Sequence, residues 1–272
     1  MKRRTFIKTI LISSGAFIFS SRNPIASAFD ANTIKILMLY NNMGNMTDFV
    51  SKWGLSMWIE NKETAILFDT GGKTSTLWKN VSTAAVDIQK LSKIVISHHH
   101  YDHVGGLPII LEKTKYRPDV YVPEANLKFI RHKNPKAKIT GVTGPIQIND
   151  YLWSTGQFRC STDFETVHEQ SLIIHQDGSL YLLTGCSHPG IVEIVKKTKQ
   201  IHPDKKLNLI IGGFHMPNYS YHQVKKISDE LKRLQVKKIG PSHCTGGTTV
   251  NIFKKKWKED YVDFCLGNSM KI

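Results

Sequence analysis

Four histidines and one aspartate lie close together in the segment Ser97–Gly106, which reads Ser-His-His-His-Tyr-Asp-His-Val-Gly-Gly. A turn that needed only hydrogen bonds would use Asn, Ser, Gly or Pro rather than a run of imidazoles. Imidazole and carboxylate groups at fixed offsets are typical ligands of a divalent metal such as zinc. The apolar run Lys93–Ile96 precedes them and predicts a buried strand that ends at the first histidine. The segment therefore predicts a metal site at the end of a strand.

Further ligands must come from other parts of the chain, because a single turn cannot complete a tetrahedral metal site. Three later segments each combine a buried apolar run with a turn that carries a histidine: Leu180–Gly190 with His188, Leu209–His215, and Val236–Gly246 with His243. The ends of strands in a layered sheet gather at one edge, so these turns can converge on the His-rich segment. Glycines beside the histidines let the backbone approach a metal or a substrate closely.

The four cysteines, Cys160, Cys186, Cys244 and Cys265, are too few and too widely spaced for a disulfide framework. Cys186 and Cys244 each lie within two residues of a candidate ligand. We expect both to be small buried side chains beside the site, with direct metal binding as the alternative.

The pattern of apolar residues changes along the chain. Strands with alternating polarity dominate before Gly190, and helices alternate with strands after it. This order favours two sheets with helices packed outside them in one domain, residues 29–272. The sequence also predicts a helix at Leu107–Lys113, a final strand at Val262–Leu266, and a basic surface loop at Lys133–Gly144, which we expect near the mouth of the site.

Residues 1–28 predict an export signal. Lys2-Arg3-Arg4-Thr5-Phe6-Ile7-Lys8 is basic with a paired arginine, Thr9–Ser21 is apolar but short for a stable membrane anchor, and Ala26-Ser27-Ala28 is a small-residue cleavage site. The pattern resembles a bacterial twin-arginine signal. It implies recognition by the twin-arginine export machinery, a periplasmic location and membrane contact through the signal alone. An uncleaved N-terminal anchor is the alternative.

The formal charge of +15 is strongly basic, and the signal accounts for five of the basic residues. A basic surface favours anionic substrates, nucleic acid or anionic lipid. The remaining lysines cluster on predicted helices, where a solvated face explains them, and aromatic residues of the kind that line nucleic-acid grooves are not interleaved with them. We therefore expect a small anionic substrate and no nucleic acid; the oligomeric state is left open.

Taken together, these motifs resemble the metallo-β-lactamase superfamily. The resemblance rests on the His-x-His-x-Asp-His turn from His98 to His103, on Asp69 after a predicted strand, and on the later histidines in order, and it extends over essentially all of residues 29–272. The chain is most similar to the dihydropterin-ribofuranosylaminobenzene-phosphate synthase-like branch, through the segments Glu169–Leu172, Thr184–His188, Gly212–His215 and Ser242–Gly246. The resemblance implies a single-domain α/β (α+β) fold, a four-layer αββα sandwich.

The resemblance also implies two divalent metal ions, in the first place zinc, with manganese or iron as alternatives. It assigns one metal to His98, His100 and His188, and the other to Asp102, His103 and His243. Asp69 would hydrogen-bond to the histidine turn and orient it, with a helix cap or a turn aspartate as the alternative.

His215 marks a departure from the superfamily. Many members place a metal-bridging aspartate after the equivalent strand, where this chain has Gly212-Gly213-Phe214-His215. His215 is therefore a candidate metal ligand, a contact or proton donor to the substrate, or a structural residue. His99 occupies the variable position of the motif, and its side chain should point away from the metals.

Two metals a few ångströms apart can activate a water molecule and polarise a carbonyl or phosphoryl oxygen. We therefore expect a binuclear zinc-dependent hydrolase that attacks a small anionic ester, lactone or phosphoester through a metal-bound hydroxide. Asp102 would orient the hydroxide, and His215 or Tyr101 would protonate the leaving group, so that Asp102 and His215 are the candidate catalytic residues.

Three other functions remain open: a transferase of the synthase type, a metal-dependent oxidoreductase, and a non-catalytic metal-binding sensor with the same fold. An exported location argues against the synthase. Di-iron members of the superfamily usually carry Glu at the position of His100, so the histidine favours zinc.

Overall fold

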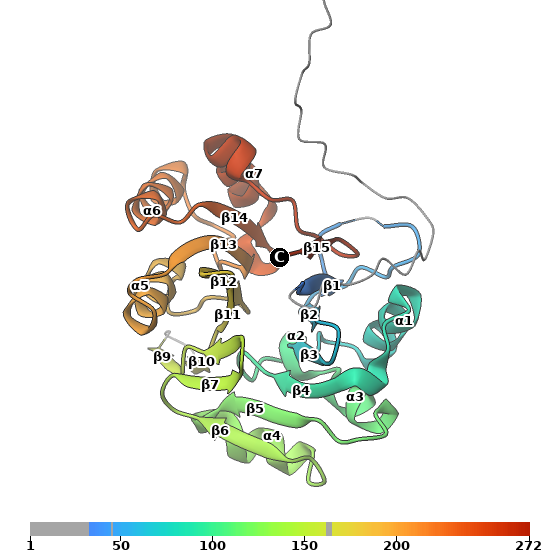
Figure 1. Cartoon of the computed structure of the whole chain (residues 1–272). Coiled ribbons are helices and arrows are strands. Elements are labelled where there is room, and N and C mark those ends of the chain that lie inside the picture. Colours follow the sequence, from blue (N-terminus) through green and yellow to red (C-terminus); the bar gives the residue numbers. More distant parts are fainter. Residues whose placement is uncertain (1–32, 45, 162–164) are drawn as a thin grey trace, which may run out of the picture.

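Two β-sheets stack face to face in the computed structural model, which describes residues 33–272 apart from 45 and 162–164 (Figure 1). The predicted export signal at residues 1–28 lies outside the described residues. Helices cover the outer face of each sheet, which makes four layers in the order αββα. The predicted fold class, a single-domain four-layer sandwich, is confirmed.

The first sheet has seven strands and is mixed. The strands β3, β4, β5 and β6 run parallel, whereas β15, β1, β2 and β3 pair antiparallel. In spatial order they are β15 (Ser269–Lys271), β1 (Lys35–Asn41), β2 (Leu55–Glu60), β3 (Ala65–Phe68), β4 (Leu91–Val95), β5 (Asp119–Pro123) and β6 (Ile139–Val142).

The second sheet has six strands, and a short hairpin lies beside it. The strands β12, β13 and β14 run parallel and the others are antiparallel. Their order is β14 (Lys238–Ser242), β13 (Lys206–Gly213), β12 (Ser179–Thr184), β11 (Leu172–Gln176), β8 (Leu152–Ser154) and β7 (Ile146–Asn149). The hairpin pairs β9 (Phe158–Ser161) with β10 (Thr166–Glu169).

The helices divide between the two outer faces. Those packed against the first sheet are α1 (Thr74–Ala84), α3 (Leu107–Lys113) and α4 (Leu127–Lys133); those against the second are α5 (Ile191–Ile201), α6 (Tyr221–Arg233) and α7 (Gly247–Trp257). The short helix α2 (Tyr101–Val104) precedes α3, and the 3-10 turns are η1 (Ile88–Lys90), η2 (Glu124–Asn126), η3 (His243–Thr245) and η4 (Lys258–Asp260).

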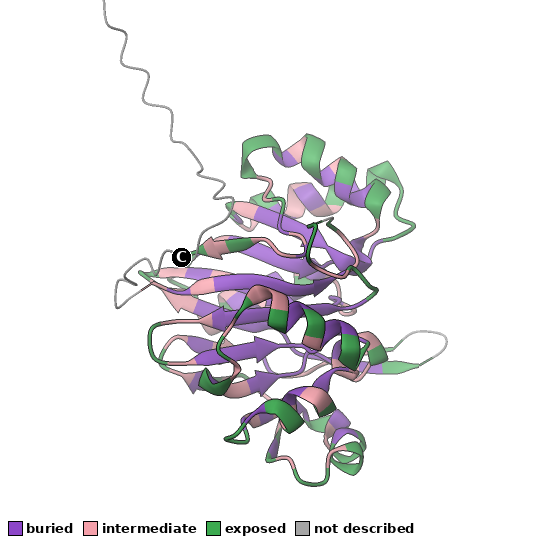
Figure 2. Cartoon of the chain, turned by 90° about the vertical axis from the view of Figure 1, so that its right-hand side faces the viewer, coloured by how far each residue is buried: buried purple, intermediate pink, exposed green. Residues whose placement is uncertain are grey.

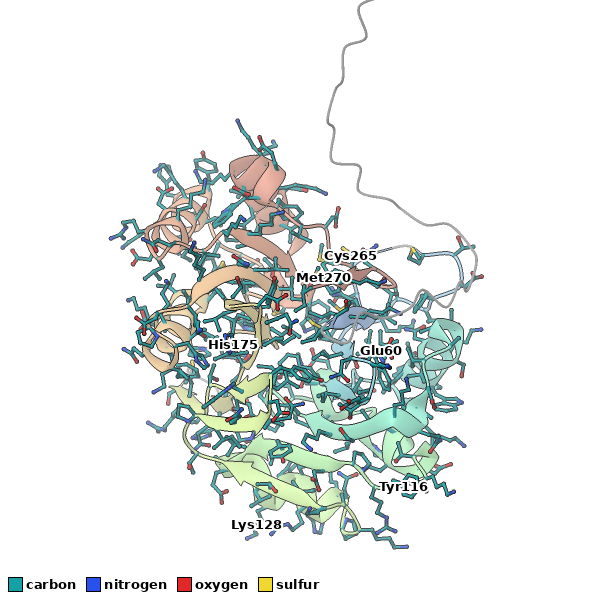
Figure 3. The ribbon with its side chains drawn as sticks, viewed as in Figure 1. Glu60, Tyr116, Lys128, His175, Cys265 and Met270 are labelled. Atoms are coloured by element: carbon teal, nitrogen blue, oxygen red, sulfur yellow. The ribbon has the colours of Figure 1, made fainter. Side chains whose placement is uncertain are left out.

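Alternation along the strands creates the layers. In β1, Ile36 and Met38 point into the core between the sheets, while Leu37 and Leu39 point toward the helices. Met270 of β15, labelled in Figure 3, packs against the core between the sheets. Each such side chain contributes about 1.5–3 kcal/mol when it leaves water. Central strands such as β1, β2 and β3 are accordingly buried on both faces, and most exposed residues lie on the helices and loops (Figure 2).

The predicted helix at Leu107–Lys113 is confirmed with the same limits. Within the described part of the chain, no helix has both the length and the apolar composition needed to cross a bilayer.

Two predictions about local structure are wrong. The predicted loop Lys133–Gly144 contains the strand β6, which pairs with β5 at the edge of the first sheet. This strand has only four residues, one of them Gly141, and is therefore too short to show the alternating polarity of a strand. Residues 262–266 do not form the predicted last strand. Val262 donates to Ile239 O in β14, and Leu266 donates to Met43 O in the loop after β1. The segment therefore contacts both sheets without adding a strand to either.

Candidate metal centre

The His-rich segment follows β4 in the middle of the first sheet. β4 lies between β3 and β5 and runs parallel to both, so the segment emerges where all three strands end. His100 precedes helix α2, whose first turn carries Asp102 and His103. His98 and His103 are fully buried, whereas the Asp102 side chain is 15% exposed. The segment thus holds its histidines inside the protein and keeps one carboxylate in reach of solvent.

The three later histidines come from the ends of parallel strands in the second sheet. His188 follows β12, His215 follows β13 and His243 follows β14. The residues Ser187, His215 and His243 have positive φ angles of 65°, 51° and 52°. Such a conformation costs a non-glycine residue about 1–3 kcal/mol and is kept where the surroundings determine it, often at functional sites.

The structure brings the three residues assigned to the first metal into one group. The ligand atoms of His98, His100 and His188 lie within 4.8 Å of one another. Nε2 of His98 is 3.1 Å from Nδ1 of His100, and the His188 ring lies 4.7 Å from that of His98, centroid to centroid. On its other side, Nε2 of His100 lies 2.7 Å from the Glu165 carboxylate, which leaves Nδ1 facing the group.

The residues assigned to the second metal form an adjoining group around the Asp102 carboxylate. Oδ2 of Asp102 lies 3.2 Å from Nε2 of His243 and 3.6 Å from Nε2 of His103. Burial opposes ionisation of Asp102, but the two imidazoles keep the pKa of its carboxyl well below the usual value. Nδ1 of His243 pairs with the amide oxygen of Asn42 at 2.7 Å, so that its Nε2 faces the group.

Asp69 holds the His-rich segment in place through hydrogen bonds. Its carboxylate is fully buried and accepts from the backbone N–H and the hydroxyl of Ser97 at 2.6 and 2.7 Å, and from Nδ1 of His103 at 2.7 Å. Burial opposes a charge on His103, yet the Asp69 carboxylate raises the pKa of this imidazole to about 9. The geometry places Asp69 where it can orient His103 and present Nε2 to a metal.

Glu169 holds the turn that carries His188, and sequence reasoning missed this role. Its buried carboxylate accepts the backbone N–H groups of Cys186 and Ser187 on one oxygen, at 2.9 and 2.7 Å. The other oxygen accepts from the backbone N–H and from Nδ1 of His188, at 2.7 and 2.8 Å. Burial opposes ionisation, but the hydrogen bonds from His188 lower the pKa of Glu169. The available signal was a charged residue next to the apolar run of β11, where an unpaired charge would be costly.

His215 lies at the exposed side of the first group. Its ring is 4.4 Å from that of His188, and its ligand atom lies within 4.8 Å of those of His188 and Cys186. A hydrogen bond with Cys244 raises the pKa of His215 above its ordinary value. The position suits either a metal ligand or a proton donor to a bound substrate.

Exposed aromatic side chains lie near both groups of assigned ligands. Trp53 and Tyr101 are 58% and 62% exposed, and the Trp53 ring lies 5.0 Å from that of His243. His99 approaches the Phe129 ring at 6.0 Å and lies 3.7 Å from the Glu165 carboxylate. Its ligand atom groups with those of Glu165 and of one assigned ligand, His100.

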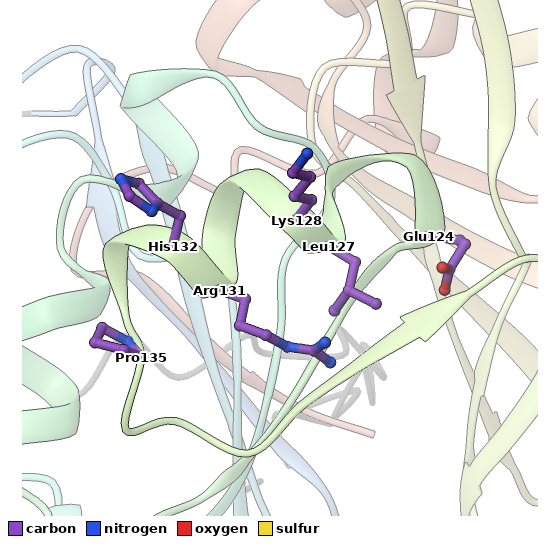
Figure 4. Close-up of a pocket in the computed structure, with 6 residues that line it drawn as sticks. All are labelled: Glu124, Leu127, Lys128, Arg131, His132 and Pro135. Atoms are coloured by element: carbon purple, nitrogen blue, oxygen red, sulfur yellow. The ribbon is translucent and has the colours of Figure 1, made fainter.

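The predicted basic segment Lys133–Gly144 begins at the end of helix α4. Lys133 ends this helix, and its ammonium lies 4.4 Å from the centre of the Phe129 ring. A hollow of about 540 Å³ opens on the same helix, and Figure 4 shows the side chains that line it: Glu124, Leu127, Lys128, Arg131, His132 and Pro135. Arg131 donates to Ile139 O, so this guanidinium is engaged within the fold. None of the lining residues is a predicted ligand.

Other histidines take no part in these groups. His175, labelled in Figure 3, lies on β11 with its ring 6.1 Å from that of His202.

The donor set itself fits a divalent metal. Nε2 of His243 is buried and has no hydrogen-bond partner among the described residues, although Asp102 lies close to it. Burial and the neighbouring imidazoles lower the pKa of His98 far below its ordinary value, which favours the neutral form that binds metals. Buried nitrogen and sulfur atoms gathered in this way are suited to hold metal ions.

Fold and site together define a metal-binding αββα protein, and comparison with known families agrees. A model of the metallo-beta-lactamase superfamily matches residues 54–192, just over half of the chain, and the chain belongs to this superfamily. It is also similar to the 7,8-dihydropterin-6-methyl-4-(beta-D-ribofuranosyl)-aminobenzene-5'-phosphate synthase of Methanocaldococcus jannaschii, with 28% identity over 88% of this chain and 97% of that protein.

Two solved structures show the same fold. Tm1679, a metal-dependent hydrolase of the beta-lactamase superfamily, matches with a TM-score of 0.72 and 24% identity over 88% of this chain and 99% of its own. Zinc-bound PqqB from Methylobacterium extorquens matches with a TM-score of 0.60 and 9% identity over 87% of this chain and 99% of its own. At these levels of identity, both similarities show a shared fold and nothing more.

Proposed function

We propose that this protein is a hydrolase that uses two divalent metal ions to cleave a small anionic ester, lactone or phosphoester. One observation carries the proposal: two adjoining groups of three ligands each meet where strands of both sheets end, with Asp102 within reach of solvent. When bound, the metals would polarise the oxygen of the scissile group and lower the pKa of a water molecule.

The chain's own residues have separate tasks in this proposal. The Asp102 carboxylate is ionised at neutral pH and orients the attacking water by accepting its proton in a hydrogen bond. His215, whose raised pKa increases its protonated fraction, donates a proton to the leaving group from the exposed side. The rim at Trp53 and Tyr101 shields the substrate from solvent, and the ammonium of Lys133 attracts its negative charge.

The test is zinc-dependent turnover. Metal-free protein is titrated with zinc while a phosphodiester, a lactone and a β-lactam substrate are assayed. We expect turnover of at least one substrate to rise with zinc and to be lost in His243→Ala. The matched variant His222→Ala removes an exposed imidazole on α6 and should behave as the unchanged protein. The absence of zinc-dependent turnover on all three substrates would contradict hydrolysis.

A second candidate is a transferase like the similar synthase, whose name describes a dihydropterin joined to an aminobenzene ribosyl phosphate. The observation that favours it is the similarity over 88% of this chain. Supplying a dihydropterin and an aminobenzene ribosyl phosphate to the zinc-loaded protein distinguishes the two. A coupled product supports the transferase, whereas cleavage of ester substrates alone supports the hydrolase.

We also propose that the twin-arginine pattern of residues 2–8 directs export to the periplasm. The support is the basic segment, the apolar stretch and the small-residue site of residues 1–28.

A further inference from the structure

The sulfur of Cys186 lies between the two groups of assigned ligands. It is 3.2 Å from Nε2 of His103, a residue assigned to the second metal. It is also within 4.8 Å of the ligand atoms of His98 and of His188, which are assigned to the first metal. It also lies within 4.8 Å of the ligand atom of His243, which is assigned to the second metal. One atom therefore adjoins both sites.

The position of this sulfur is fixed by the fold. Cys186 is 3% exposed, and its backbone N–H donates to the buried Glu169 carboxylate at 2.9 Å. The backbones of β12 and β13 approach closely here, since a Cβ at Gly213 would lie 2.4 Å from Gly185 O and 3.2 Å from Cα of Cys186. Burial and the hydrogen bond to Glu169 hold Cys186 beside the histidines.

The charge of the ligand set also favours a thiolate. Two divalent ions bring four positive charges to a buried space, and the six assigned ligands supply one carboxylate, that of Asp102, and five imidazoles. Repulsion between such ions is strong at short range in a medium of low dielectric constant. A negative atom placed between them reduces that repulsion.

We propose that Cys186 is a thiolate ligand shared by the two metal ions. The inference rests on the proposed metal-dependent function and names a ligand that connects its two sites. When metal binds, the thiol of Cys186 would release its proton to solvent, and the resulting thiolate would supply electron pairs to both ions. The sulfur of Cys244 groups with Cys186 and with His243, a residue assigned to the second metal, so Cys244 serves as the comparison in the test.

The test uses cobalt(II) as a spectroscopic probe on the purified full chain. Cobalt bound to a thiolate absorbs in the near ultraviolet through charge transfer from sulfur, which histidine and carboxylate ligands do not produce. We expect this band in the unchanged protein with two cobalt ions bound. Cys186→Ser should lose the band and bind the second ion at least about tenfold more weakly, because removing even a residue that only orients a metal ligand costs about 10–100-fold in affinity.

Three further variants keep the test decisive. Cys186→Asp retains a negative ligand, so it should bind two cobalt ions without the band, which excludes misfolding as the cause. Cys244→Ser and Cys265→Ser, which changes a partly exposed free cysteine, should both keep the band. A band that survives in Cys186→Ser, or that is lost in Cys244→Ser alone, would overturn the proposal. Two bound cobalt ions without a band in the unchanged protein would overturn it and leave the proposed function standing, whereas no bound cobalt would overturn both.

Discussion

Replacing Glu169 with Gln should weaken zinc binding and destabilise the fold, because this one carboxylate holds the turn Cys186–His188. Each of its oxygens accepts two N–H groups, over distances of 2.7–2.9 Å. The glutamine amide has a single oxygen. In either orientation its NH2 group must face two N–H donors, so two hydrogen bonds are lost and the donors are left without partners.

The size of the effect follows from those two bonds. A hydrogen bond to a charged group contributes about 1.5–3 kcal/mol, so losing two costs about 3–6 kcal/mol. Burying a neutral amide in place of a charge recovers part of this, and we expect the free energy of unfolding to fall by about 3 kcal/mol. His188 loses the partner of its Nδ1, and losses of this kind weaken metal binding about 10–100-fold.

Two measurements check the prediction. Urea unfolding of the metal-free protein gives the free energy of unfolding, and competition with a chelator gives the zinc affinity. The control is Glu112→Gln on α3, whose carboxylate is 67% exposed and pairs with Lys113 at the surface. It should change stability by no more than about 0.5 kcal/mol and leave zinc affinity unchanged. If Glu169→Gln matched this control in both measurements, the reasoning about the turn would be refuted.

Asp69→Asn removes the negative partner of His103 Nδ1, so calorimetric titration should show the second zinc bound about 10–100-fold more weakly and the first unchanged; equal weakening of both would contradict the assignment. Asp102→Asn should lower zinc-dependent turnover by about 10²–10⁴-fold with an unchanged circular dichroism spectrum, and full activity would exclude a catalytic role. Changing Arg3 and Arg4 together to Lys should retain the protein in the cytoplasm in cell fractionation; normal export of this variant would contradict the twin-arginine proposal.

The layers and the strand ends could be predicted because their signals are local. β4 is a short apolar run that leads directly into the His-rich segment, and β12, β13 and β14 each lead to a glycine-rich turn with one histidine. Parallel strands necessarily deliver such turns to one edge. The histidines therefore come together as a consequence of strand order, and the structure places all six assigned ligands in the two groups.

Apart from Asp69, the residues that hold the ligands could not be predicted, because their partners are distant in sequence. Asn42 pairs with His243 across 201 positions, and Glu165 with His100 across 65. Glu169 lies 19 positions before His188 and is recognised only when β10 and the turn after β12 are seen together. Nothing in the local pattern separates these side chains from solvated ones.

Short edge strands were missed for a different reason. β6 has four residues and β15 has three. A period of two needs several residues to become visible. The apolar residues Phe264 and Leu266, which favoured a strand, are buried as the chain passes beside the sheets without regular pairing.

The most direct test of the two-metal account is a crystal structure of the zinc-loaded protein with anomalous data collected at the zinc absorption edge. The account predicts two peaks a few ångströms apart, one bound by His98, His100 and His188 and the other by Asp102, His103 and His243. A single peak away from these residues, or no peak from protein that has been saturated with zinc, would contradict it.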